Sequence, residues 1–208
     1  MNRVSSFVVC VVLIFGVAIS LTGTGYSSEK ESKEKMMEKG KEMMGMEETV
    51  MVGGQAMFPK KDIVDNAVNS ADHTTLVAAV KAAGLVETLK GPGPFTVFAP
   101  TNDAFENLPE GTVETLLKPE SKDTLVKVLT YHVVPGKLGY NEIAEQIKAG
   151  GGKAELKTAS GGTLTAMMNG DVSVVLQDEN GNVANISTYD VYQSNGVIHV
   201  VDKVVLPK

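Results

Sequence analysis

The stretch GPFTVFAPTNDAFENLP, residues 93–109, combines the signals of a strand, a turn and a short helix. Its first part, FTVFA, is a β-type apolar run bounded by prolines, which interrupt a hydrogen-bonded ladder. After Pro100, either Thr101 or Asn102 can cap the free N–H groups of a following helix. Phe105 and the leucine three residues later share one helical face and can pack that helix back onto the strand. The stretch contains no Lys or Arg that would hold an anion, so it indicates a fold element and not an active site.

Residues 1–25 have the three-part pattern of a secretory signal peptide. A weakly basic start precedes an almost unbroken apolar run, residues 7–21, which is short for a membrane span, and small residues follow it. Cleavage before Tyr26 and cleavage after Ser20 are alternatives, and an uncleaved N-terminal anchor is a third. The sequence therefore predicts a secreted or periplasmic protein with no stable transmembrane segment after cleavage. Cys10 lies inside the apolar run, so the mature chain is expected to form no disulfide.

The charge composition argues against nucleic acid as a partner. The 208-residue chain has a formal net charge of −6, and Arg3, its single arginine, lies in the predicted signal. Affinity for nucleic acid comes from cationic contacts with phosphates, and an acidic chain without arginine offers few of them. Tryptophan is absent and aromatic residues make up 5% of the chain, which disfavours stacking surfaces for single strands or sugars.

Residues 26–56 are rich in Met, Lys and Glu, and we interpret them as an exposed linker. Four methionines repeat at a seven-residue spacing, so one helical face could gather their thioethers: Met36, Met37, Met43 and Met44. Thioethers select Cu(I), which makes these residues weak candidates for a copper site. We favour a polar linker with adaptable apolar side chains, because no His or Cys accompanies the methionines. We expect no other metal site and no cofactor.

Residues 57–208 are predicted to form one folded domain. Helical patterns dominate its first half, at 62–68, 73–85, 111–117, 121–134 and 140–150. The period then changes to two, and the sequences NGD and DENGN mark hairpin turns. Helices followed by strands predict an α+β domain with a largely antiparallel sheet.

The helix ends are predicted from capping residues. Asp72 is expected to cap the helix that begins at residue 73, and Gly84 is expected to end that helix. Thr112 is expected to cap the helix in segment 111–117. In segment 121–134, helical spacing places four side chains on one apolar face: Leu125, Val128, Leu129 and His132.

Three blocks of this sequence resemble the fasciclin domain. They are GPFTVFAPTNDAFENLP, LTYHVVPGKL and SNGVIHVVDKVVLP, and the resemblance covers about residues 57–208. The VGG, MFP and DIVDNAVNS motifs also resemble small secreted bacterial members with a single domain. The resemblance implies a compact α+β fold, a β-wedge of about seven strands with a layer of short helices, in an extracytoplasmic protein. The residues that carry this signature are Phe95, Pro100, Thr101, Asn102, Phe105, Gly196, His199 and Asp202.

The resemblance also sets the functional expectation. The family implies no shared catalytic mechanism, so we expect a monomeric, non-enzymatic adhesion or binding module whose partners are cell-surface or matrix proteins or polysaccharides. In some animal members a Tyr-His block and an Asp-Ile pair are linked to integrin binding. Tyr131 and His132 match the first block, whereas the region SNGVIHVVDKVV lacks the second. The alternatives are a small-molecule or lipid carrier with a hydrophobic crevice between helices and sheet, and Cu(I) handling through the linker.

The remaining candidates for chemistry are interpreted as structural. His73, His132 and His199 lie on different elements without the short ligand spacing of a zinc site, so we expect core histidines that bind backbone carbonyls. Asp103 and Glu106 are one helical turn apart, where carboxylates favour the positive end of a helix.

Overall fold

A computed structural model of the protein describes residues 49–109, 111–170 and 172–208. The predicted signal peptide and the methionines considered as copper ligands lie outside these residues. Within the described residues, none of the helices combines the length and the hydropathy that a membrane crossing requires.

The fold begins with a hairpin of two short antiparallel strands, β1 (Val50–Val52) and β2 (Gln55–Met57). Val52 and Met57 are buried in the core, so the hairpin is part of the domain. The predicted boundary at residue 57 is therefore wrong, and the fold starts within the segment assigned to the linker. Strands of three residues are too short to show a reliable period, which is why the sequence did not reveal them.

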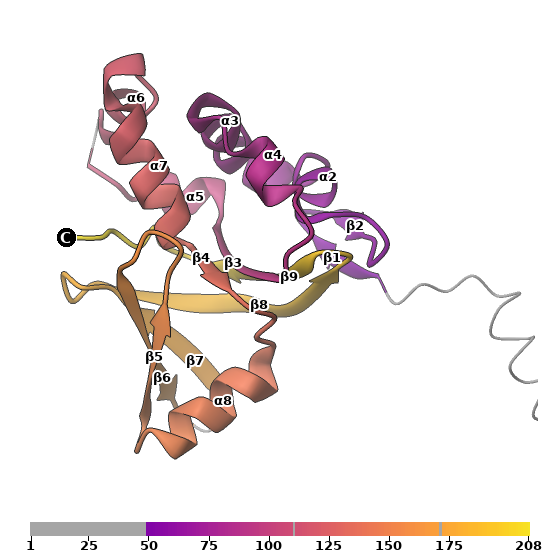
Figure 1. Ribbon diagram of the computed structural model, residues 1–208, viewed down its shortest axis with the longest axis vertical. Coiled ribbons are helices and arrows are strands. Elements are labelled where there is room, and N and C mark those ends of the chain that lie inside the picture. The colour runs from indigo at the N-terminus through magenta and orange to yellow at the C-terminus, as the bar shows by residue number, and fades with distance from the viewer. Residues whose placement is uncertain (1–48, 110, 171) are drawn as a thin grey trace, which may run out of the picture. The chain divides into compact units, whose positions relative to one another are not determined.

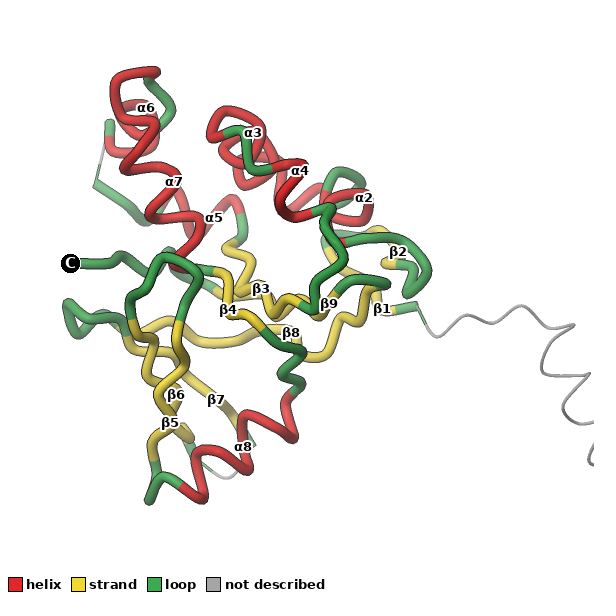
Figure 2. The backbone as a smooth tube through the Cα atoms, in the orientation of Figure 1, coloured by secondary structure: helices red, strands yellow, loops and turns green. Residues whose placement is uncertain are grey.

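Short helices cover one side of the sheet in two groups, as Figure 1 shows. The first group comprises α2 (Ile63–Ala67), the 3₁₀ turn η1 (Ala71–His73), α3 (Thr74–Ala83) and α4 (Val86–Leu89). The second comprises α5 (Asn102–Glu106), α6 (Thr112–Leu116), the 3₁₀ turn η2 (Pro119–Ser121) and α7 (Lys122–Tyr131). Helix α8 (Tyr140–Ala149) lies apart from both groups (Figure 2) and packs against two strands of the C-terminal half.

The main sheet has seven strands in the order β4-β3-β9-β8-β7-β6-β5. Their bounds are β3 (Phe95–Pro100), β4 (Val133–Pro135), β5 (Lys153–Lys157), β6 (Thr163–Asn169), β7 (Ser173–Gln177), β8 (Val183–Gln193) and β9 (Gly196–Val201). All neighbours are antiparallel except β3 and β9, which run parallel. This confirms the predicted α+β class with its wedge of seven strands and its short helices.

The central strands β3 and β9 are buried on both faces, which explains their continuous apolar sequences. On β3, Val97 and Ala99 pack with the helices of the first core cluster, whereas Phe98 packs with α8 and the C-terminal strands in the second. Strand β5, by contrast, alternates between buried and exposed residues. Phe98 is fully buried, and truncation of such a side chain to alanine typically costs about 3–5 kcal/mol.

The sheet is nearly closed on itself. The strands at its two ends, β4 and β5, meet where the Ala159 N–H donates a hydrogen bond of 2.7 Å to the Val133 carbonyl. The last two residues of the predicted helix 121–134, Val133 and Val134, belong to strand β4, so the predicted helix is too long. Helical spacing persists up to His132 because that residue is the C-cap of α7.

Three helix ends were predicted at Asp72, Gly84 and Thr112, and the structure confirms only Gly84. Asp72 lies inside η1, and His73 occupies the N-cap position of α3 without a capping hydrogen bond from its side chain. Helix α6 is preceded by Gly111 with φ of 78°, so Thr112 is its first residue and not its cap. Gly84 ends α3 in the left-handed conformation, with φ of 75°, as predicted.

Candidate functional site

The strand–turn–helix stretch is built as the sequence predicts, and its polar side chains bind the fold itself. Thr101 is the N-cap of α5, and its Oγ1 accepts a hydrogen bond from the Ala104 N–H at 3.2 Å. Asn102 reaches the first helical group: its Oδ1 accepts from the Thr75 N–H at 3.0 Å, and its Nδ2 donates to the Ala71 carbonyl at 2.9 Å. These contacts fasten α5 to η1 and α3 and occupy the polar atoms that an anion site would use.

Tyr131, a family-implied binding residue, is fully buried. Its hydroxyl donates to the Thr163 carbonyl at 2.8 Å and accepts from the Glu179 N–H at 3.2 Å, which ties α7 to β6 and the turn after β7. Burial, with a smaller contribution from the carboxylates of Glu179 and Asp178, raises the pKa of Tyr131 to about 12. The phenol therefore stays neutral and acts as a structural hydrogen-bonding group.

His132 is also buried and has both ring nitrogens engaged. Its Nδ1 lies 2.8 Å from the Val128 carbonyl and carries the proton in this geometry, while Nε2 accepts from the Val205 N–H at 3.1 Å. Burial lowers the pKa of His132 to about 4. Because Tyr131 and His132 are hidden from solvent, any role that they have in binding a partner is indirect, through the position of α7.

His199 lies at the centre of the sheet and holds a backbone carbonyl, as the sequence predicts. Its Nε2 lies 2.8 Å from the Leu138 carbonyl, its Nδ1 accepts from the Asp190 N–H at 3.3 Å, and its ring stacks on Phe98. Burial lowers the pKa of His199. Asp190 has a positive φ of 57° and interrupts β8, so this histidine supports an irregular point in the strand.

His73 is buried, as predicted, and its Nδ1 forms a hydrogen bond of 2.8 Å with the Ser70 hydroxyl. A serine and a histidine at hydrogen-bond distance can form a catalytic pair, but Ser70 and His73 are 1% and 3% exposed. A substrate cannot reach either group. The pair lies beside β1, where the Ser70 hydroxyl also approaches the Val52 carbonyl, so it fixes the N-terminal hairpin against η1. No group of three His, Cys, Asp or Glu side chains in the described part of the chain could hold a metal ion.

Two of the C-terminal signature residues hold β9 against its neighbouring strands β3 and β8. A Cβ on Gly196 would lie 2.0 Å from the Phe95 carbonyl oxygen, so only glycine fits where β9 runs beside β3. Asp202 accepts hydrogen bonds from the N–H and the Nδ2 of Asn185, both at 2.7 Å, and clips the end of β9 to β8.

Asn195 is a structural residue that the sequence analysis missed. Its Oδ1 accepts from the Ile63 N–H at 3.1 Å, and its Nδ2 donates to the carbonyls of Leu89 at 2.7 Å and Gly91 at 3.0 Å. One buried amide therefore joins the β8–β9 turn to α2 and α4. The Asn-Gly sequence predicts a turn and carries no signal for contacts more than a hundred residues away.

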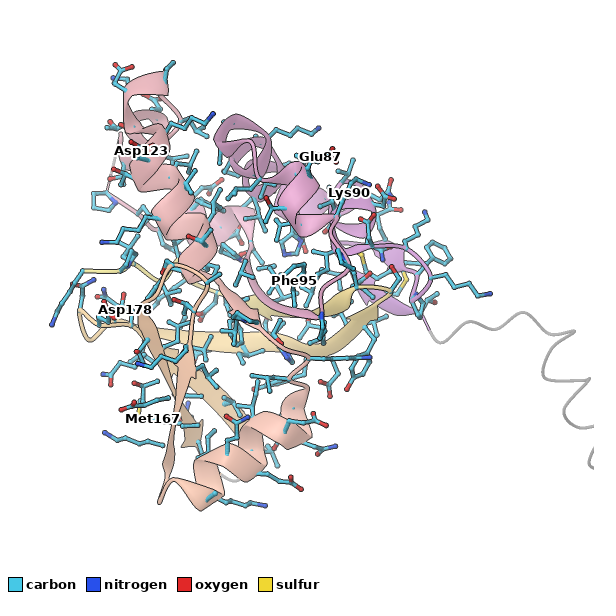
Figure 3. All side chains as sticks on the ribbon, in the orientation of Figure 1. Glu87, Lys90, Phe95, Asp123, Met167 and Asp178 are labelled. Carbon is cyan, nitrogen blue, oxygen red and sulfur yellow. The ribbon has the colours of Figure 1, made fainter. Side chains whose placement is uncertain are left out.

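An apolar cleft lies between the two helical groups and the sheet, and we call it the helix–sheet cleft. Its lining comes from α2, α3, α4, α7 and strands β3, β4 and β9, and includes Leu76, Val77, Val80, Leu85, Val86, Leu89, Phe95, Val97, Leu129, Val133 and Ile198. Figure 3 shows Phe95 at its base, between α4 and the sheet. The exposed residues Lys81, Thr88 and Ala159 also border it, so the cleft opens to solvent. Its volume is about 100 Å³.

The fold and its signature residues match a known family. The family model described as the fasciclin domain matches residues 71–207. The chain belongs to the fasciclin domain family. Protein sll1483 of Synechocystis sp. is 50% identical over 80% of this chain and 84% of that protein. This confirms the resemblance recognised in the three sequence blocks.

Two further relatives illustrate how the family is used. The cell surface glycolipoprotein MPB83 of Mycobacterium bovis is 32% identical over 75% of this chain and 64% of that protein. A solved pair of FAS1 domains from the insect cell adhesion molecule fasciclin I has a TM-score of 0.51 and 18% identity, over 63% of this chain and 43% of that chain. The second likeness supports the fold alone. Fasciclin domains thus occur in a bacterial surface protein and in an adhesion molecule of animals.

Proposed function

We propose that this fasciclin protein is an exported, monomeric and non-catalytic binding module that contacts proteins or polysaccharides at the cell surface, in the matrix or in the periplasm. The observation that carries the proposal is the helix–sheet cleft, an apolar opening to solvent. The polar side chains of the fasciclin signature, by contrast, make structural contacts within the domain. Apolar pockets that accept a side chain of a partner supply much of the affinity at protein interfaces. The apolar N-terminal run and the description of the relative MPB83 as a cell surface protein support export.

The size of the cleft favours a binding module over a carrier. Sites for small organic ligands have volumes of about 300–1,000 Å³. The cleft has about 100 Å³, less than a cavity of about 150 Å³ that holds one benzene molecule. A lipid chain or a cofactor would leave most of its surface outside, whereas one apolar side chain fits.

The chemistry of the lining favours binding over catalysis. General acid–base catalysis needs a titratable group with access to the substrate. Two titratable side chains line the cleft, His132 and Lys81. Both ring nitrogens of His132 are bound to the backbone, and the lining offers Lys81 no carboxylate or thiol as a catalytic partner. The lining therefore provides apolar burial and one positive charge, that of Lys81.

The proposal is tested by filling the cleft. Val77 is half-buried in the lining on α3, and Val77→Phe would occupy the volume that a partner needs. Val68→Phe is the matched control, because Val68 is 49% exposed at the end of α2 and does not line the cleft. A deletion strain is complemented with each chain, and surface attachment and biofilm mass are measured. We expect Val77→Phe to lose the wild-type phenotype and Val68→Phe to keep it. Normal attachment with Val77→Phe, or an unchanged deletion strain, would count against the proposal.

A further inference from the structure

The helix–sheet cleft is apolar inside and cationic at one edge. Lys81 is exposed on the last turn of α3 and belongs to the lining. Lys122 begins α7, and its Nζ lies 3.8 Å from the position that a Cβ on Gly84 would take, just after α3 ends. Lys81 thus borders the cleft itself, and the Lys122 ammonium lies beside Gly84, next in the chain to the lining residue Leu85.

These two lysines are available to a partner. The ion pairs recorded among the described residues join Lys90 to Asp62 and Asp65, on the far side of α4, and neither Lys81 nor Lys122 takes part in them. The carboxylates of Glu87 and Asp123 belong to the flanking helices but do not line the cleft (Figure 3). The positive edge is thus not neutralised from within the cleft.

We infer that the helix–sheet cleft binds an acidic peptide segment of a partner protein, with one aliphatic or aromatic side chain in the cleft and the adjacent carboxylate at Lys81 and Lys122. This inference rests on the proposed function and names the chemistry of its partner. Burial of one apolar side chain strengthens binding by about ten- to a hundredfold. The carboxylate adds orientation and speeds association, because opposite charges steer the encounter.

The same features disfavour the other partners. A polysaccharide presents hydroxyl groups, and their burial against an apolar lining without hydrogen-bond partners is unfavourable. A lipid tail exceeds the volume of about 100 Å³. A peptide places a single side chain there and keeps its backbone outside, where water and the exposed Thr88 hydroxyl can bind it.

The inference is tested with two matched peptides. Both are acetylated and amidated hexapeptides with one central leucine, followed in one by two aspartates and in the other by two lysines. Binding to the purified exported chain is measured by NMR titration. We expect the acidic peptide to shift resonances of α3, α7 and β3 and the basic peptide to bind at least about tenfold more weakly, since two opposite charges are replaced by like ones. Added salt should weaken the acidic peptide.

Four variants localise the effect. Lys81→Glu should weaken the acidic peptide by about fivefold or more, while Lys148→Glu, an exposed lysine on α8, should leave it unchanged. Val77→Phe should abolish binding, and Thr88→Trp, which covers the mouth from an exposed position on α4, replaces it if Val77→Phe fails to fold. Equal affinity for both peptides, or an unchanged affinity after Lys81→Glu, would overturn the inference. The acidic peptide could fail to bind while Val77→Phe still abolishes surface attachment. This outcome would overturn the acidic peptide as the partner and leave the cleft as a binding site.

Discussion

Acidification is expected to destabilise this domain through His132. The fold holds the imidazole neutral, because Nδ1 donates to the Val128 carbonyl and Nε2 accepts from the Val205 N–H. Burial lowers the pKa of His132 from 6.5 to about 4, whereas the unfolded chain keeps the ordinary value. Between these two pKa values the unfolded chain binds a proton that the folded chain does not. The free energy of unfolding therefore falls as the pH falls through this window.

The size of the effect follows from the two pKa values. His132 alone should lower the free energy of unfolding by about 2 kcal/mol between about pH 7 and about pH 5, and by about 3 kcal/mol once the pH is below about 4. Burial also lowers the pKa values of His199 and His73, so both act in the same direction. The pKa of Glu179 is lowered by hydrogen bonds from the Thr163 and Lys208 N–H groups, so this carboxylate stays ionised between about pH 7 and about pH 5.

The assay is urea unfolding of the purified protein across this pH range, compared with His132→Gln. The variant should be less stable at neutral pH, because the glutamine cannot make both backbone contacts, but it should lose about 2 kcal/mol less on acidification to about pH 5. Lys148→Gln, at an exposed site, should follow the wild type. The reasoning is refuted if His132→Gln and the wild type lose the same free energy of unfolding over this range.

The other predictions concern stability and metal binding. Asn195→Ala removes three hydrogen bonds, two of them buried, and should cost about 3 kcal/mol in urea unfolding. Asn185→Ala, at an exposed contact, should cost about 1 kcal/mol or less, and equal costs would contradict this account. Gly196→Ala places a Cβ 2.0 Å from a carbonyl oxygen and should cost at least about 3 kcal/mol or prevent soluble expression, and a wild-type melting temperature would contradict it. Cu(I) titration of chains with and without residues 26–50 should give the same curve if that segment is a linker, and a saturable site found only in the longer chain would assign copper to its methionines.

The parts of the fold that the sequence could predict are those set by local chemistry. Gly84 ends α3 because a left-handed residue is needed there, and Thr101 caps α5 because its oxygen is the nearest acceptor for the helix N–H groups. Strand β4 and the N-terminal hairpin could not be predicted, because each strand has three residues and owes its form to pairing with a partner. Asp72 failed as a cap because a 3₁₀ turn precedes α3, and that turn is held by packing with the hairpin.

The site was harder to predict, since it depends on distant contacts. The sequence placed His132 on an apolar face, and its burial confirms this, but the hydrogen bond from Val205 comes from residues far along the chain. Asn102 and Asn195 resemble ordinary capping and turn residues, yet each joins elements that only the fold brings together. A crevice between helices and sheet was one of the predicted alternatives. Its small volume and the lysine in its lining, Lys81, follow from how the helices pack on the sheet, which the sequence does not show.

The parallel pairing of β3 with β9 also determines when the molecule can finish folding. The register joins Phe95 to Gly196, so β3 has only the three-residue β4 as a partner until about 100 further residues are available. A chain that emerges N-terminus first from a ribosome or an export channel therefore cannot complete either core cluster until almost its last residue is free. The buried Val204 and Val205 follow β9, so even a short C-terminal truncation removes part of the core. Until β9 is available, the rest of the chain therefore stays only loosely folded.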